Sequence, residues 1–107
     1  MSNPKLQALA RIAQMKSDRT LAEFSSAQEA FGRRKAAFEA LEAERDALRR
    51  QLAEDVTQAL RVETYLVFLG MRAAAAALDL ERARQVMLGA LERAKTDFSR
   101  ASVLKNL

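Results

Sequence analysis

Residues 53–60 read AEDVTQAL, and this stretch decides whether the chain forms one helix or two. On each side of it, apolar residues recur at alternating steps of three and four, which is the spacing of a coiled-coil seam. The two series share one frame only if Asp55 occupies a seam position, where a charged side chain is unfavourable. We therefore predict a turn at about 53–59, with Asp55 or Thr57 capping the second helix, although neither Gly nor Pro marks it. One unbroken helix of about 100 residues that dimerises along its length is the alternative.

Before the turn, we predict a helix over about residues 4–53. Ser2 or Asn3 can cap this helix, and Pro4 fits its first turn, where the missing N–H of proline is not needed. Most of its seam positions are apolar. The seam residues are Leu6, Ala10, Ala13, Ser17, Thr20, Phe24, Ala27, Phe31, Arg34, Phe38, Leu41, Arg45, Leu48 and Leu52.

After the turn, we predict a second helix over about residues 57–105. Its seam is more uniformly apolar than the first, since only one member is polar. The seam residues are Ala59, Val62, Leu66, Leu69, Ala73, Ala76, Leu80, Ala83, Met87, Ala90, Ala94, Asp97, Ala101 and Leu104.

The two helices are expected to pair in antiparallel orientation, with facing residue numbers that sum to about 114. In this register Phe24 faces Ala90 and Phe31 faces Ala83, so each large ring meets a methyl group and fills the space between the helices. The predicted fold is all-α, a long antiparallel two-helix coiled-coil hairpin that forms a single unit over residues 1–107.

The composition supports an all-helical chain and excludes several kinds of chemistry. Of 107 residues, 50% are hydrophobic and 30% charged, with three Gly and one Pro. Without Cys or His, the chain can form no disulfide, and it lacks a thiol nucleophile, the usual general base and most zinc ligands. Two helices also enclose no substrate cavity. We therefore predict no catalytic, cofactor-binding or metal-binding residue and no enzymatic activity.

The net charge of +4 is a mild bias along the sequence. Residues 1–52 carry ten basic and seven acidic side chains, and residues 53–107 carry eight and seven. We therefore expect no nucleic-acid binding. The most apolar run is interrupted by Arg72 and Asp79, and the N-terminus has no signal-peptide pattern, so we expect a cytoplasmic protein without a membrane span.

Residues 65–78, YLVFLGMRAAAAAL, are apolar on more than one side of the predicted helix. Some of these residues belong to the seam, but others form a second series that faces outward. We expect this second series to bind a protein partner, with Met providing an adaptable contact. The alternative is that it closes a weak homo-oligomer of hairpins. The candidate partner-binding residues are Val67, Met71, Ala74 and Leu78, flanked by Tyr65 and Phe68.

Arg34 and Arg45 interrupt the first seam, and we interpret them as register determinants whose charged heads reach outward. Gly70 lies inside the second helix, where it indicates either the close approach of another chain or a simple surface position. The alternative hypothesis for the basic residues is that an acidic partner or a phosphate contacts the cations Arg33, Lys35, Arg49 and Arg50.

Three segments together resemble the FliJ and YscO family of type III export proteins. They are LQALARIAQMKSDRTLAEFSSAQEAFGRRKAAFEALEAERDAL at 6–48, YLVFLGMRAAAAAL at 65–78, and an Ala- and Arg-rich arm that ends in RASVLKNL. Members of this family are small cytoplasmic antiparallel hairpins that resemble the rotor stalk of rotary ATPases. The resemblance implies a soluble, non-enzymatic component of a flagellar or injectisome export apparatus, peripheral to its membrane-embedded complex.

The resemblance also implies partners and surfaces. The partners would be the export ATPase ring, the cytoplasmic domain of the export gate, and export chaperones. The gate would bind the outward stripe around Met71, and the ring would receive a stalk end formed by Leu6, Leu9, Ile12, Val103 and Leu104, with Leu107 beside them. The competing hypothesis is a structural or regulatory coiled-coil oligomer that spaces or inhibits a partner complex.

Overall fold

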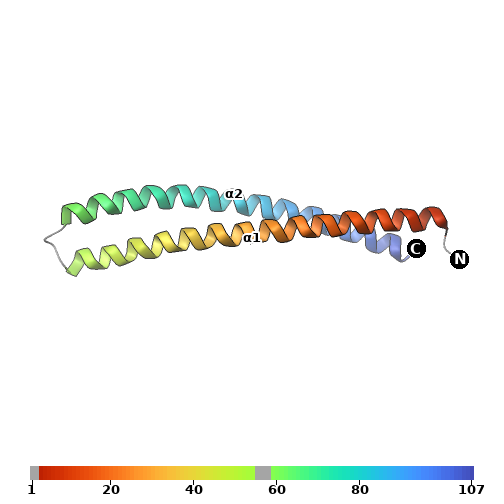
Figure 1. Ribbon diagram of the computed structural model, residues 1–107, viewed down its shortest axis with the longest axis horizontal. Coiled ribbons are helices and arrows are strands. Elements are labelled where there is room, and N and C mark those ends of the chain that lie inside the picture. The colour runs from red at the N-terminus through yellow and green to blue at the C-terminus, as the bar shows by residue number, and fades with distance from the viewer. Residues whose placement is uncertain (1–2, 55–58) are drawn as a thin grey trace. The chain divides into compact units, whose positions relative to one another are not determined.

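The structure, a computed structural model, describes residues 3–54 and 59–107 and contains two helices in this part of the chain (Figure 1). Helix α1 spans Pro4–Glu54 and helix α2 spans Ala59–Lys105. These bounds lie within two residues of the helix ends predicted from the sequence. The predicted caps Asp55 and Thr57 fall outside the described residues.

Asn3 caps the start of α1. Its side-chain Oδ1 accepts a hydrogen bond of 2.9 Å from the backbone N–H of Lys5, and its carbonyl accepts one of 3.0 Å from the N–H of Gln7. The cap satisfies N–H groups that have no partner inside the helix. Helix α2 closes with Lys105 in its last turn, where a positive charge complements the helix dipole.

The contacts divide the chain into two units, and each is described separately. The terminal unit comprises Met1–Ala30 and Arg84–Leu107, and the central unit comprises Phe31–Ala83. In each unit a segment of α1 packs against a segment of α2 that runs in the opposite direction. The chain is therefore an all-α helical hairpin, and the alternative of one unbroken helix is wrong.

The seam of the terminal unit is built mainly from small side chains. Ala90, Ala94 and Ala101 are buried from α2, and Ser17 and Thr20 are buried from α1. The Thr20 hydroxyl donates to the backbone carbonyls of Lys16 at 3.1 Å and of Ser17 at 3.2 Å. Because its own helix satisfies this hydroxyl, Thr20 can occupy the seam without a polar partner on α2.

The seam of the central unit is larger and more apolar. Leu69 is fully buried, Ala73 is 2% exposed, and the other seam residues described in this unit are half-buried except Arg34. The Arg34 side chain is 59% exposed and its Nη1 lies 3.9 Å from Asp79 Oδ2. Its head thus reaches outward from a seam position, as expected for a long charged side chain.

Three contacts between the helices test the predicted register in the central unit. Arg34 pairs with Asp79, Arg45 lies against Gly70, and Tyr65 donates a hydrogen bond to Glu44. The first two pairs have residue numbers that sum to 113 and 115, close to the predicted value of about 114, whereas Tyr65 and Glu44 sum to 109 and meet through two long side chains. The antiparallel register inferred from large and small seam residues is therefore the one the chain adopts in this unit.

Arg45 differs from the prediction because its head does not reach freely into solvent. Its Nη1 lies 2.7 Å from Glu42 Oε1 on the same helix, and its buried Nε has no hydrogen-bond partner among the described residues. A Cβ atom placed on Gly70 would lie 3.8 Å from Arg45 Nη2. The neighbour of Gly70 is therefore a side chain of the same chain, and no second chain is needed to explain this glycine.

Candidate interaction surfaces

The first candidate surface is the outer stripe of α2, formed by Val67, Phe68, Met71, Ala74 and Leu78 in the central unit. All five side chains are exposed, and Met71 is 70% exposed. Helical spacing places them off the seam of α2. The sequence placed these residues outward, and the structure has them there. Their role in binding a partner stays a prediction.

The outer stripe begins earlier than the sequence analysis proposed. Leu60 is 83% exposed and precedes Val67 by two helical turns on the same face of α2. Between them, the Thr64 hydroxyl donates to the Leu60 carbonyl at 3.0 Å, so its polar group is satisfied within the helix. The signal for Leu60 was present in the sequence, since it continues the alternating three- and four-residue spacing of the stripe.

One edge of the outer stripe is held by an aromatic cluster. The rings of Tyr65 and Phe68 stack with centroids 6.0 Å apart, and the guanidinium carbon of Arg72 lies 5.8 Å from the Phe68 centroid. The Tyr65 hydroxyl donates a hydrogen bond of 2.9 Å to Glu44 Oε1 on α1. These contacts restrict the orientation of the two rings, whereas the exposed Met71 side chain is unbranched and can change its rotamer.

The Glu44 carboxylate also changes the acidity of Tyr65. The hydrogen bond to Glu44 and the negative charge of that carboxylate raise the pKa of Tyr65 above its ordinary value of 10.0. Burial raises this pKa further, and the positive charge of Arg72 lowers it. Tyr65 therefore stays a neutral hydrogen-bond donor at neutral pH.

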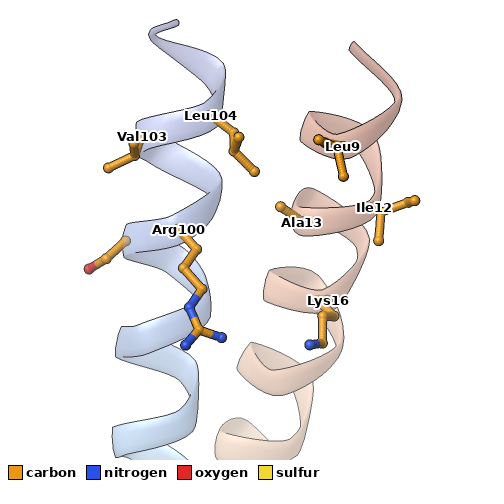
Figure 2. Close-up of a pocket in the computed structure, with 8 residues that line it drawn as sticks. Leu9, Ile12, Ala13, Lys16, Arg100, Val103 and Leu104 are labelled. Carbon is orange, nitrogen blue, oxygen red and sulfur yellow. The ribbon is translucent and has the colours of Figure 1, made fainter. Parts of the chain in front are cut away.

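The second candidate surface is an open groove in the terminal unit, here called the terminal groove (Figure 2). It has a volume of about 480 Å³. Its walls are largely apolar, with one cation from each helix at one end. It is lined by Leu9, Ile12, Ala13 and Lys16 of α1 and by Ser99, Arg100, Val103 and Leu104 of α2.

The structure brings most of the predicted stalk-end residues together. Leu9, Ile12 and Val103 are exposed at the terminal groove, and Leu104 is half-buried there. Leu6 is half-buried and lies outside this groove, in a neighbouring depression that Leu104 and Leu107 also line.

Leu21 and Phe98 form an apolar surface that was not predicted from the sequence. Both are more than half exposed and, with Phe24, Leu91 and Ala94, they line another groove of about 210 Å³ in the terminal unit. Each follows a seam position by one residue. Because the seam here is built from small side chains, large residues beside it protrude instead of being covered.

The described residues give no support for a metal centre or a membrane span. Within 3–54 and 59–107, no group of three or more His, Cys, Asp or Glu side chains lies close enough to hold a metal ion. Neither described helix is long and apolar enough to cross a bilayer. The candidate phosphate-binding cations Arg33, Lys35 and Arg50 are exposed, and Arg49 Nη1 lies 3.4 Å from Asp46 Oδ1 of its own helix.

Charge is distributed unequally between the two units. The terminal unit contains nine basic and five acidic residues, whereas the central unit contains nine of each. The whole net charge of +4 therefore belongs to the terminal unit. This difference in net charge does not show in a count along the sequence, because the terminal unit combines the two ends of the chain.

The fold and its surfaces define a class of protein, a helical hairpin that presents exposed apolar surfaces on both of its units. Comparison of the chain with family models, curated proteins and solved structures gives no match. The resemblance to the FliJ and YscO family is therefore carried by the sequence pattern alone.

Proposed function

We propose that this chain is a non-enzymatic adaptor of a type III protein export apparatus, flagellar or injectisome. In this role it is a coiled-coil stalk that links the export ATPase ring to the export gate and handles export chaperones. The gate binds the outer stripe of α2, and the ring receives the terminal end around Leu9, Ile12 and Val103. A cytoplasmic location at the membrane-embedded complex follows from this role.

The exposure of the outer stripe is the observation that carries the proposal. Val67, Met71 and Leu78 remain more than 60% exposed although the chain has its own apolar seam to bury side chains in. A contiguous apolar surface of this kind is typical of protein-binding sites. The stacked pair of Tyr65 and Phe68 adds the kind of rigid aromatic contact that dominates binding energy at such sites.

The same exposure also favours a second candidate function, a structural or regulatory oligomer of hairpins. In that case the outer stripe of one copy packs on the stripe of another and buries the same residues. The two candidates differ in the size of the isolated protein. The adaptor is a monomer that binds the gate, whereas the oligomer is a stable multimer without any partner.

A substitution at the centre of the outer stripe tests the proposal. Met71→Glu places a charge where the gate domain would exclude water, so its affinity for the gate cytoplasmic domain should fall at least about tenfold. Met15→Glu is a matched control, because Met15 in the terminal unit is 71% exposed, almost the same as Met71. Affinity is measured by isothermal titration calorimetry, with helix content checked by circular dichroism.

The outcomes separate the two functions. If wild type binds neither the gate domain nor the ATPase, or if both variants weaken binding equally, the adaptor role is wrong. If light scattering instead gives a stable multimer that Met71→Glu dissociates, the oligomer of hairpins is the correct function.

A further inference from the structure

We propose that the terminal groove binds an acidic amphipathic helix of a protein partner. The apolar residues of that helix pack on Leu9, Ile12 and Val103, and one of its carboxylates lies between Lys16 and Arg100. The inference rests on the terminal end assigned to the proposed stalk, and it adds the chemistry of the ligand that binds there.

The shape of the terminal groove suits a helix better than an enclosed ligand. The groove is open along one side, with α1 and α2 as its two walls (Figure 2). From Leu9 to Lys16 it covers two helical turns, or about 10 Å. A ligand helix can lay one apolar face into such a groove and keep its other face in water. Ala13 leaves space between the walls for the side chains of the ligand.

Lys16 and Arg100 supply the charge selectivity. They extend from opposite walls into the same end of the terminal groove (Figure 2). Neither side chain forms an ion pair or a hydrogen bond with another described residue. Two cations that face each other repel, and a carboxylate between them replaces this repulsion with two charge-assisted hydrogen bonds.

The surroundings of the terminal groove favour an acidic protein over the other possible occupants. The terminal unit carries the whole net positive charge of the chain, so it attracts an acidic segment and repels a second terminal unit. An anionic membrane would also attract these cations. However, a flat bilayer does not enter a groove between two helices, whereas a ligand helix does.

A synthetic peptide provides the probe. It is a helical peptide of about 18 residues, with Leu at i, i+4 and i+7 and Glu one turn further along the same face. Binding to the full-length chain is measured by fluorescence anisotropy, and the binding site is located by amide chemical shifts in NMR. The acidic peptide should bind, with an affinity that falls as salt rises. The same peptide with Lys in place of Glu should bind at least about tenfold more weakly.

Charge reversal on the protein tests the two cations. Lys16→Glu combined with Arg100→Glu should lower the affinity for the acidic peptide at least about tenfold and should create a preference for the Lys peptide. The control combines Arg11→Glu with Lys95→Glu, two exposed cations of the same unit that do not line the terminal groove. This control changes the net charge equally and should retain most of the affinity.

Several outcomes overturn the inference. It is wrong if both peptides bind alike, if neither binds at millimolar concentration, or if the control variant loses as much affinity as the groove variant. The chain could instead bind vesicles of phosphatidylglycerol and phosphatidylcholine more tightly than the acidic peptide. If the variant with Lys16→Glu and Arg100→Glu lost this vesicle binding, the groove would be assigned to a membrane surface. Dimerisation that Ile12→Glu abolishes would assign it to a second copy. Because Met71→Glu should leave peptide binding unchanged, failure here is distinguishable from failure of the gate-binding proposal.

Discussion

At the scale of single residues, Tyr65 connects the outer stripe to the opposite helix. Its ring stacks on Phe68, and its hydroxyl donates to Glu44 of α1. It is the only tyrosine of the chain, and there is no tryptophan. Its absorbance and fluorescence therefore report on this one position without interference.

The acidity of Tyr65 can be measured directly. Because Glu44 raises its pKa, titration of the phenolate absorbance should give a midpoint above 10.0 in the folded protein. Folding then stabilises the protonated phenol, so this contribution to stability is present below the ordinary pKa and is lost as the pH rises through the raised value. Glu44→Gln keeps a hydrogen-bond acceptor but removes the charge, and it should move the midpoint back toward 10.0.

The control for this titration is Glu39→Gln, which removes an exposed carboxylate from the same helix without touching the Tyr65 hydrogen bond. Its midpoint should stay at the wild-type value. A wild-type midpoint at or below 10.0 would show that the hydrogen bond to Glu44 is not formed in solution.

Individual side chains were predictable from the sequence only where periodicity determines their direction. The outward positions of Val67 and Met71 follow from helical spacing alone. The hydrogen bond between Tyr65 and Glu44 does not, because it depends on the pairing register and on the rotamers of two long side chains. For the same reason, the contact of Arg45 with Gly70 was not foreseen.

At the scale of the helix, the two faces of α2 differ in burial. Leu69 lies in the seam and is fully buried, whereas Leu78 lies on the outer stripe and is 61% exposed. Leu69→Ala should therefore lower the free energy of unfolding by about 3 kcal/mol, through lost burial and the cavity left behind. Leu78→Ala should lower it by less than about 1 kcal/mol. Urea denaturation followed by circular dichroism measures both.

The same pair of variants separates stability from binding. If the outer stripe binds the gate domain, Leu78→Ala should weaken that binding more than it weakens the fold. Equal destabilisation by the two variants would mean that Leu78 is buried in solution, by self-association or by a different helix pairing. In that case destabilisation by Leu78→Ala should grow with protein concentration.

The helices themselves were predictable because few features compete with their periodicity. Helix α1 contains Pro only at its first residue, and the strong helix formers Ala, Leu, Glu and Arg dominate both helices. Every predicted seam residue whose burial the structure describes is therefore buried or half-buried, apart from the exposed Arg34. The turn was located by a break in the apolar pattern at Asp55, since no local turn residue marks it.

At the scale of the whole molecule, the antiparallel fold gives the two units different net charges. Sequential halves carry similar net charge, but the fold combines the first 30 residues with the last 24, and this combination contains the entire excess of basic residues. A count along the sequence could not reveal this, because the relevant grouping depends on the antiparallel pairing. An acidic molecule would therefore be attracted more strongly to the terminal unit than to the central unit, whose net charge is zero.

A pair of introduced cysteines tests the hairpin itself. The chain contains no native cysteine, so Phe31→Cys combined with Ala83→Cys creates one unique pair at positions of the central unit that face each other in the predicted register. In a monomeric hairpin the two thiols belong to one chain, so oxidation should give an intrachain disulfide whose yield does not depend on protein concentration. Non-reducing electrophoresis detects this product.

As a control, Phe31→Cys with Ala76→Cys separates the thiols by about 10 Å along α2, which is too far for a disulfide. Disulfide-linked multimers whose yield increases with protein concentration would instead mean that two chains pair along their lengths. The second copy would then cover surfaces that are exposed in a single hairpin.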